Sequence, residues 1–319
     1  MAKQKLVMIG NGMAGLRTIE EILERSQSQL DITIIGKEPY PNYNRIMLSN
    51  ILQKKMTVED TIMNPYDWYQ ENNIELINND PVEKVDKENK IVTTSKGIEV
   101  KYDICIFATG SKAFVLPIPG SNFPSVIGWR TIDDTNKMIE IAQTKKRAVV
   151  IGGGLLGLEC ARGLLDQGME VTVLHLADWL MEMQLDRKAG DMLKADLEKQ
   201  GMKIELQANS KEIIGDKDVE AIKLADGQVI ETDLVVMAVG IRPYTEVAKD
   251  SGLDVNRGIV VNDYMQTSDS HIYAVGECAE HDGKVYGLVA PLYEQGKVLA
   301  DYLTCLLYTS PSPRDRQKS

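Results

Sequence analysis

The fold is decided by the stretch LVMIGNGMAG at residues 6–15, an apolar run followed at once by a G-x-G-x-x-G pattern. An amphipathic helix is predicted next, over residues 16–24, and then a second apolar strand over residues 32–35. Strand, glycine loop, helix and strand in this order are typical of a nucleotide-binding βαβ unit.

The pattern occurs a second time. AVVIGGGLLG at residues 148–157 precedes a predicted helix over 158–167 and a strand over 171–174. The segments 102–110 and 232–240 also resemble each other, and each is predicted to add a closing strand to its unit. The sequence therefore predicts an α/β protein with two Rossmann-like domains.

Short alternating segments lie between the paired motifs. Residues 90–94 and 221–224 are examples, and the second is followed by the hairpin-like pair Asp226-Gly227. We expect a small antiparallel sheet before each closing strand. The proline-bearing segment 116–120 is expected to connect the first domain to the second, which is inserted in it.

Composition excludes several function classes. The chain has 319 residues and a net charge of −11, with 47 acids against 36 bases, which disfavours nucleic-acid binding. No uncharged apolar run reaches the roughly 18 residues that span a bilayer, and residues 1–5 leave no room for a signal peptide. We expect a cytoplasmic protein without membrane association.

The four cysteines lie far apart and form no C-x-x-C pair. Reduced, buried thiols are expected, and no metal site. Residues 305–319 are polar, proline-bearing and basic, and they resemble translated sequencing-adapter read-through. The alternative is a natural disordered tail, and in either case the segment is left out of the fold prediction.

Each glycine of the two fingerprints has a physical role. The first allows a tight turn, the second lets a pyrophosphate approach the backbone, and the third lets the helix pack against the sheet. The helix N-terminus then stabilises the diphosphate charge. These glycines are Gly10, Gly12 and Gly15 in the first unit and Gly152, Gly154 and Gly157 in the second.

An acidic residue that binds the adenosine ribose is expected at the end of the second strand of each unit. Glu38 fits in the first unit, although a solvated loop carboxylate is the alternative. In the second unit the corresponding residue is His175. Histidine can hydrogen-bond a ribose hydroxyl, but without an acid or a following arginine the choice between NADH and NADPH stays open. Two dinucleotide sites in one chain predict a relay in which hydride passes from a nicotinamide to a flavin.

The chain, from about residue 3 to residue 303, resembles the pyridine nucleotide–disulfide oxidoreductase superfamily, in its rubredoxin/ferredoxin-reductase-like branch. Within that branch the chain is similar to the N-terminal module of assimilatory NAD(P)H nitrite reductase large subunits. The motifs that carry the resemblance are residues 10–15, 41–49, 152–159, 236–243, 273–280 and 287–295.

The resemblance implies an FAD site and a NADH or NADPH site. It implies that FAD is held by Gly10, Asn11, Gly12, Met13, Ala14, Gly15, Glu38, Arg45, Val82, Ala108, Thr109, Gly110, Arg130, Gly276, Glu277, Ala290 and Pro291. It implies that the nicotinamide cofactor is bordered by Gly152, Gly154, Leu155, Leu156, Gly157, Glu159, His175 and Gly240. Hydride transfer between cofactors needs no catalytic residue, and Glu159 and Arg130 are expected near the rings.

Several of these residues could instead have a purely structural role. Arg45 and Arg130 could be surface arginines, Glu159 a solvent-facing helix residue, and Glu277 a helix cap. The chain also departs from many relatives. Asn50 stands where they carry a lysine, and residues 40–53 contain no cysteine, so electrons must leave the flavin by another route.

The predicted FAD-binding domain comprises residues 1–115 and 245–305, the NAD(P)H-binding domain residues 116–244, and the tail residues 306–319. The resemblance implies an enzyme fragment that passes hydride from NAD(P)H to FAD. Electrons then pass to iron–sulfur and siroheme centres further downstream, or to a small carrier protein. The alternatives are a free-standing rubredoxin or ferredoxin reductase, an NADH oxidase, or a non-catalytic flavin-binding sensor; a homodimer is left open.

Overall fold

The computed structural model describes residues 3–26 and 30–307. The last helix runs to Leu307, so the tail expected from residue 305 begins inside it, and residues 308–319 lie outside the described residues. The described chain divides into two compact units. The first comprises the described parts of Met1–Tyr43, Ile62–Ser111 and Pro243–Ser319, and the second comprises Asn44–Thr61 and Lys112–Arg242.

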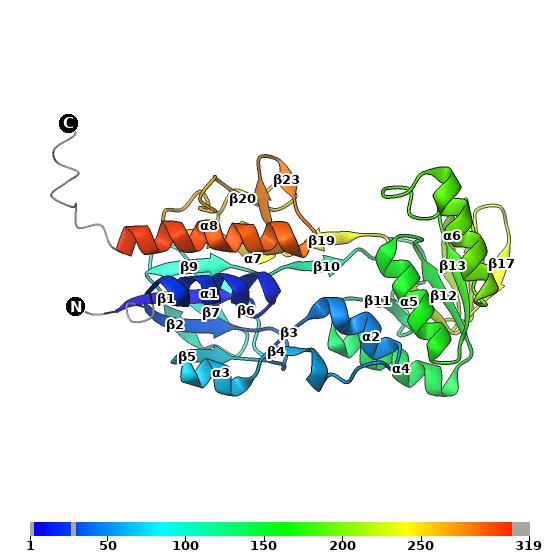
Figure 1. Cartoon of the computed structure of the whole chain (residues 1–319), viewed down its shortest axis with the longest axis horizontal. Coiled ribbons are helices and arrows are strands. Elements are labelled where there is room, and N and C mark those ends of the chain that lie inside the picture. Colours follow the sequence, from blue (N-terminus) through cyan, green and yellow to red (C-terminus); the bar gives the residue numbers. More distant parts are fainter. Residues whose placement is uncertain (1–2, 27–29, 308–319) are drawn as a thin grey trace. The chain divides into compact units, whose positions relative to one another are not determined.

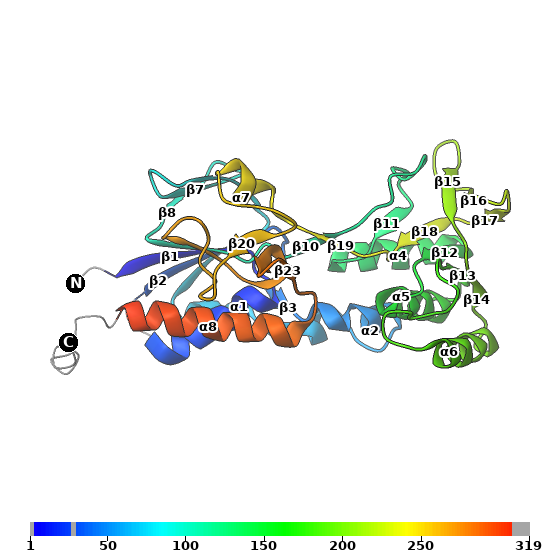
Figure 2. The same ribbon diagram turned by 90° about the horizontal axis from the view of Figure 1, so that it is seen from above.

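The first unit is built on a five-stranded parallel sheet with the order β21-β9-β1-β2-β5 (Figure 1). Its strands are β1 (Gln4–Ile9), β2 (Leu30–Ile35), β5 (Ile74–Ile77), β9 (Ile104–Phe107) and β21 (Ile272–Ala274). The helices of this unit are α1 (Met13–Ser26), α3 (Tyr66–Glu71), α7 (Glu246–Asp250) and α8 (Val289–Leu307). Figures 1 and 2 show α1 and α8 side by side.

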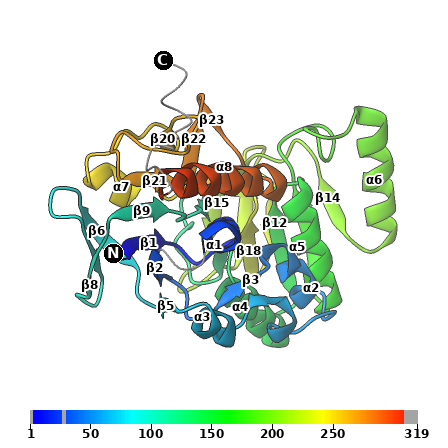
Figure 3. The same cartoon turned by 60° about the vertical axis from the view of Figure 1, so that its left-hand side comes forward.

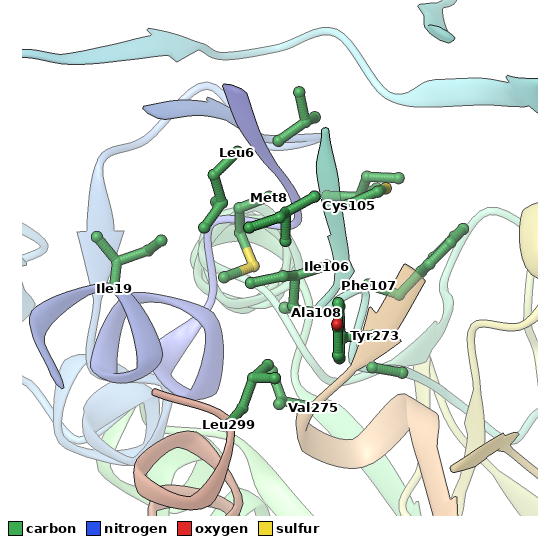
Figure 4. Packing of buried hydrophobic residues seen from close by; sticks show 14 of the residues in the cluster. Leu6, Met8, Ile19, Cys105, Ile106, Phe107, Ala108, Tyr273, Val275 and Leu299 are labelled. Carbon is green, nitrogen blue, oxygen red and sulfur yellow. The ribbon is translucent and has the colours of Figure 1, made fainter. Parts of the chain in front are cut away.

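A large part of the core of this unit lies between the sheet and these two helices. Figure 4 shows Met8 of β1 and Ile106 of β9 with Ile19 of α1 and Leu299 of α8 among the buried side chains. All four are fully buried, which is why both central strands read as continuous apolar runs in the sequence. The helices approach closely at Gly296, where a Cβ atom would lie 2.7 Å from Thr18 Oγ1.

Smaller sheets complete the first unit. The antiparallel sheet of β6 (Val82–Asp86), β7 (Ile91–Thr94) and β8 (Glu99–Lys101) lies on the face of the main sheet opposite α1 and α8 (Figure 2). The remaining elements are β3 (Asn42–Tyr43), β4 (Ile62–Asn64), β20 (Ile259–Val261), the 3-10 turn η3 (Gly276–Cys278), β22 (Ala279–His281) and β23 (Lys284–Val285). Two further short strands, β10 (Ser111–Ala113) and β19 (Ile241–Pro243), pair with each other, and most of their residues belong to the second unit.

The second unit repeats the plan of the first. Its five-stranded parallel sheet has the order β11-β18-β12-β13-β14. The strands are β11 (Val126–Gly128), β12 (Arg147–Ile151), β13 (Glu170–Leu174), β14 (Lys203–Glu205) and β18 (Leu234–Met237). The helices are α4 (Ile132–Thr144), α5 (Leu155–Asp166) and α6 (Arg187–Lys199), and the antiparallel sheet comprises β15 (Ser210–Ile214), β16 (Ala221–Leu224) and β17 (Val229–Glu231).

One segment differs from the domain boundaries expected from the sequence. Residues 44–61 were expected in the first domain, but they belong to the second unit. They form η1 (Arg45–Met47), α2 (Leu48–Leu52) and η2 (Glu59–Thr61), and α2 lies beside α5 (Figure 3). Leu52 is fully buried against Gly163, where a Cβ atom would lie 2.6 Å from Leu52 Cγ, and Gln167 Nε2 donates to the Leu52 carbonyl at 2.7 Å.

The predicted fold class is confirmed: both units are parallel α/β sheets, and each carries a small antiparallel sheet. The predicted helices and strands of the two fingerprints are present, with ends that differ by a few residues. Among the described residues, no helix is both long and apolar enough to cross a bilayer.

Candidate functional site

The first glycine loop joins β1 to α1. Gly10 has φ +116, and a Cβ atom there would lie 2.2 Å from the Ala108 carbonyl oxygen, so only glycine fits. Gly12 is different, because a Cβ atom on it would meet no atom of the described chain within 4 Å. The loop is therefore packed tightly against the sheet at its first glycine and faces open space at its second, as a backbone that receives a pyrophosphate requires.

A buried hydrogen-bond network holds this loop. The Tyr69 hydroxyl donates to Asn11 Oδ1 at 2.8 Å and accepts from the Asn42 backbone N–H at 3.1 Å. Asn42 Nδ2 donates to the Asn11 carbonyl at 3.1 Å. Burial raises the pKa of Tyr69 to about 12, so the hydroxyl remains protonated at neutral pH. The loop-positioning roles of Tyr69 and Asn42 were not predicted, because neither residue stands near the fingerprint in sequence.

The acid expected at the end of β2 is present and oriented. Glu38 Oε2 accepts from the Tyr43 hydroxyl at 2.7 Å, and the Glu38 carbonyl accepts from the Asn79 N–H at 3.1 Å. The side chain is half-buried, so the solvated-loop alternative does not describe it. Val82 begins β6, where it pairs with Thr94.

The segment after β9 is brought together with two others of the first unit. Thr109 Oγ1 donates to the Tyr244 carbonyl at 2.8 Å, and the Tyr244 N–H donates to the Gly110 carbonyl at 2.9 Å. Ser111 Oγ donates to Glu277 Oε2 at 2.6 Å. Glu277 is thereby held by the hydroxyl that follows the A-T-G segment, which fixes the carboxylate side chain.

Gly276 and α8 are joined as well. Gly276 has φ +86, and its N–H donates to Gln295 Oε1 of α8 at 2.8 Å. Ala290 and Pro291 lie in the first turn of α8, where the missing N–H of proline costs no helical hydrogen bond. The residue before the helix, Leu288, is 72% exposed.

The second glycine loop has the same geometry as the first. Gly152 has φ +120, and a Cβ atom there would lie 2.3 Å from the Ala238 carbonyl oxygen. A Cβ atom on Gly154 would meet no described atom within 4 Å. Gly157 packs on the loop itself, since its Cβ atom would lie 2.0 Å from the Gly152 carbonyl oxygen. Leu155 is 59% exposed at the start of α5, where the helix N-terminus meets the open space.

His175, at the end of β13, is engaged within the chain rather than open to a ligand. It is 7% exposed, Nδ1 accepts from the Gly153 N–H at 3.0 Å, and Nε2 lies 2.9 Å from Glu182 Oε2. Both ring nitrogens therefore have protein partners. The expectation that His175 itself meets a ribose hydroxyl does not match this geometry.

Glu159 of α5 is half-buried, which differs from the solvent-facing alternative. Desolvation by burial raises the pKa of its carboxyl group, and a hydrogen bond with Ser49 opposes that effect. Asn50, which stands where many relatives carry lysine, directs Nδ2 at the Met47 and Met56 sulfur atoms at 3.1 and 3.5 Å.

Arg45 and Arg130 meet in the second unit. Arg45 Nη1 donates to the Arg130 carbonyl at 2.8 Å. Arg130 precedes α4, and its N–H donates to Asp134 Oδ2 at 2.8 Å, within the capping box formed by Thr131 and Asp134. Gly240 follows β18 with φ +114 and faces open space.

The three cysteines whose side chains the structure describes form no disulfide. Cys105, Cys160 and Cys278 are free and buried, and burial raises the thiol pKa of each. No group of three or more His, Cys, Asp or Glu side chains that could hold a metal ion occurs among the residues that the structure describes.

Two glycine loops of equal geometry, each at the carboxyl end of a parallel sheet, are the candidate cofactor sites. The family model of pyridine nucleotide-disulphide oxidoreductases matches residues 4–296. The chain belongs to this family. It is therefore an oxidoreductase, and the family implies FAD and a pyridine nucleotide as cofactors.

Three comparisons place the chain within the family. It is 57% identical to nitrite reductase [NAD(P)H] of Bacillus subtilis (strain 168), over 98% of this chain and 38% of that protein. It is 46% identical to the assimilatory nitrate reductase electron transfer subunit of the same organism, over 98% of this chain and 41% of the other. Its structure resembles a ferredoxin reductase from Rhodopseudomonas palustris, with a TM-score of 0.88 and 28% identity over 95% of this chain and 76% of that one. The chain thus spans less than half the length of these two curated relatives.

Proposed function

We propose that this oxidoreductase transfers hydride from NAD(P)H to FAD, with FAD in the first unit and NAD(P)H in the second. One observation carries the proposal: each unit has a fingerprint loop whose first glycine is locked against the sheet and whose second faces open space. That is the form of a cradle for a diphosphate, and it occurs twice.

The residues present fit the two cofactors. In the first unit, the backbone around Gly12 and the N-terminus of α1 would bind the FAD pyrophosphate, and Glu38 would accept from the adenosine ribose. Glu277, held by Ser111, would accept from a hydroxyl of the ribityl chain. In the second unit, the backbone around Gly154 and the N-terminus of α5 would bind the NAD(P)H pyrophosphate. When bound, the flavin supplies an acceptor that takes two electrons together and releases them singly.

We further propose that this chain is the NAD(P)H-oxidising part of a nitrite-reducing system. The support is the similarity to nitrite reductase [NAD(P)H] and to a nitrate reductase electron transfer subunit. The iron–sulfur and siroheme centres that reduce nitrite would belong to other parts of that system. Clustered cysteines are needed to ligate an iron–sulfur centre, and the three in the described part of this chain are separate and buried.

The test uses the chain loaded with FAD. NADH or NADPH oxidation is followed at 340 nm, first with ferricyanide as an artificial acceptor and then with nitrite. We expect turnover with ferricyanide and none with nitrite. A Gly12→Ala variant serves as the control that should lose FAD while remaining folded. Absence of turnover with ferricyanide in a flavin-loaded sample would refute the proposed hydride transfer, and nitrite-dependent oxidation would refute the proposed division of labour.

A ferredoxin reductase is the second candidate, because the structural resemblance to the Rhodopseudomonas palustris enzyme extends over 76% of that chain. Reading the gene past codon 304 separates the candidates. A continuation of several hundred residues with clustered cysteines favours the nitrite-reducing system, whereas about 80–100 further residues would favour a free-standing reductase.

A further inference from the structure

The loop that follows β13, residues 175–186, contains a carboxylate that the fingerprint rule does not predict. An acid is expected at the end of this strand, but His175 stands there. Glu182, seven residues later, places Oε2 2.9 Å from His175 Nε2. The loop, rather than the strand, therefore supplies a carboxylate at this end of the sheet.

The hydrogen bonds of His175 fix its tautomer. The Gly153 N–H is a donor, so the Nδ1 atom that it meets at 3.0 Å must be the unprotonated ring nitrogen. The proton of the neutral ring is then on Nε2, which donates to Glu182. The imidazole has no nitrogen left for a ligand. Its role is to orient Glu182, whose side chain remains 35% exposed.

Two backbone hydrogen bonds of Gly153 hold the loop to the glycine fingerprint. Gly153 donates its N–H to His175, and its carbonyl accepts from the Met181 N–H at 3.1 Å. Met181 adopts φ +57, an uncommon conformation for a side chain of this size. A Cβ atom on Gly153 would lie 2.6 Å from Leu180 Cδ2 and 2.7 Å from His175 Cγ, so the arrangement requires glycine between the two fingerprint glycines.

The arginine that follows the loop is already paired within the chain. Arg187, the first residue of α6, contacts Asp178 Oδ2 at 2.7 Å and Asp191 Oδ2 at 3.8 Å. An arginine is the group that would bind the 2′-phosphate of NADPH, and this one is committed to two carboxylates. The loop itself, residues 175–186, contains three carboxylates and no lysine or arginine. Its own charge therefore favours a ligand with hydroxyl groups over one with a phosphate.

We propose that Glu182, positioned by His175, selects NADH over NADPH. The Glu182 carboxylate accepts hydrogen bonds from the adenosine ribose hydroxyls of NADH and repels the 2′-phosphate of NADPH. This inference rests on the proposed function, because it requires that the second unit binds the nicotinamide cofactor. It assigns the choice of cofactor to a loop residue and gives His175 a positioning role.

The experiment measures dissociation constants of NAD⁺ and NADP⁺ by calorimetry on the FAD-loaded chain, since the oxidised forms do not react with oxidised flavin. We expect NAD⁺ to bind more tightly than NADP⁺ by on the order of tenfold or more. Glu182→Gln should weaken NAD⁺ binding on the order of tenfold and bring the two constants close together. Glu220→Gln, the same change at an exposed position of the second unit, should leave both constants unchanged.

Two changes at His175 test the positioning role. Glutamine offers both an acceptor for the Gly153 N–H and a donor for Glu182, so His175→Gln should retain most of the preference for NAD⁺. His175→Leu offers neither and should lose it, but should add little in a chain that already carries Glu182→Gln.

Equal binding of NAD⁺ and NADP⁺ by the unmodified chain, or an unchanged ratio in Glu182→Gln, would overturn the inference while leaving the proposed function intact. Binding of neither dinucleotide would overturn both.

Discussion

Within each cofactor loop, the first and second glycines differ in what a methyl group would meet. At Gly10 a Cβ atom would collide with the Ala108 carbonyl, whereas at Gly12 it would enter open space. Both glycines belong to one sequence pattern, which assigns the first to a tight turn and the second to the approach of a pyrophosphate. The pattern does not reveal which atom excludes a side chain at Gly10, because the Ala108 carbonyl follows β9 and is not a neighbour in sequence.

Gly10→Ala should therefore destabilise the protein, and Gly12→Ala should not. The expected cost of Gly10→Ala is about 2 kcal/mol or more, from a positive φ and a backbone collision. Urea unfolding of the flavin-free chain measures it. Gly12→Ala should keep the stability of the unmodified chain within about 0.5 kcal/mol and lose FAD affinity. Equal stability of the two variants would show that the Gly10 turn does not press against the Ala108 carbonyl.

The burial of Glu159 predicts how the stability of the protein depends on pH. Burial raises its pKa in the folded state, so the folded protein takes up this proton more readily than the unfolded chain. The ionised carboxylate then costs stability at neutral pH, and that cost disappears as the pH falls through the folded-state pKa towards the unfolded value of about 4.3. Glu159→Gln, which resembles the protonated form, should be more stable than the unmodified chain at pH 7.5 and equal to it near pH 4.

Urea unfolding at the two pH values tests this, with Glu140→Gln on the exposed face of α4 as the control. A stability difference for Glu159→Gln that grows as the pH falls would contradict the expected sign.

At the scale of elements, α1 and α5 were predictable because each follows an apolar strand and a glycine fingerprint. The antiparallel sheets were predicted from alternation and a hairpin turn, and both are present. The grouping of segment 44–61 with the second unit was not predicted, because the segment contacts α5, more than 100 residues away in sequence. The contact between Leu52 and Gly163 leaves no local sequence pattern from which this grouping could be predicted.

The start of α4 is held by the capping box of Thr131 and Asp134. Asp134 caps this helix and also accepts from the Arg130 N–H, so it joins the helix start to the segment that contacts Arg45. Asp134→Ala should cost about 1–2 kcal/mol of the stability of the second unit. Chemical unfolding monitors it, and Glu140→Ala, an exposed change on the same helix, should cost far less. A cost for Asp134→Ala no larger than that of the control would mean that the capping box contributes nothing.

At the scale of the whole molecule, the internal repeat in the sequence predicted the two sheets and their common strand plan. It also predicted two glycine loops with the same backbone conformation. What the sequence could not predict was which partners hold the residue at the end of the second strand in each unit. Glu38 stands there in one, and in the other a histidine is satisfied by a glycine and a loop carboxylate.

Two independent sites should respond to ligands independently. At a hundredfold excess over the dissociation constant, each ligand adds about 2.7 kcal/mol to the stability of the state that binds it. FAD should stabilise the unmodified chain and Gly154→Ala but not Gly12→Ala, whereas NAD⁺ should stabilise the unmodified chain and Gly12→Ala but not Gly154→Ala. Thermal unfolding with each ligand separates these cases. Loss of both responses in either variant would contradict the assignment of one dinucleotide to each unit.

Anaerobic mixing of the FAD-loaded chain with NADH measures hydride transfer itself. If one chain binds both cofactors and passes hydride between them, the flavin absorbance near 450 nm should bleach and return when air is admitted. A flavin that remains bound and yellow after an excess of both NADH and NADPH would contradict hydride transfer and leave a flavin-binding sensor as the better description.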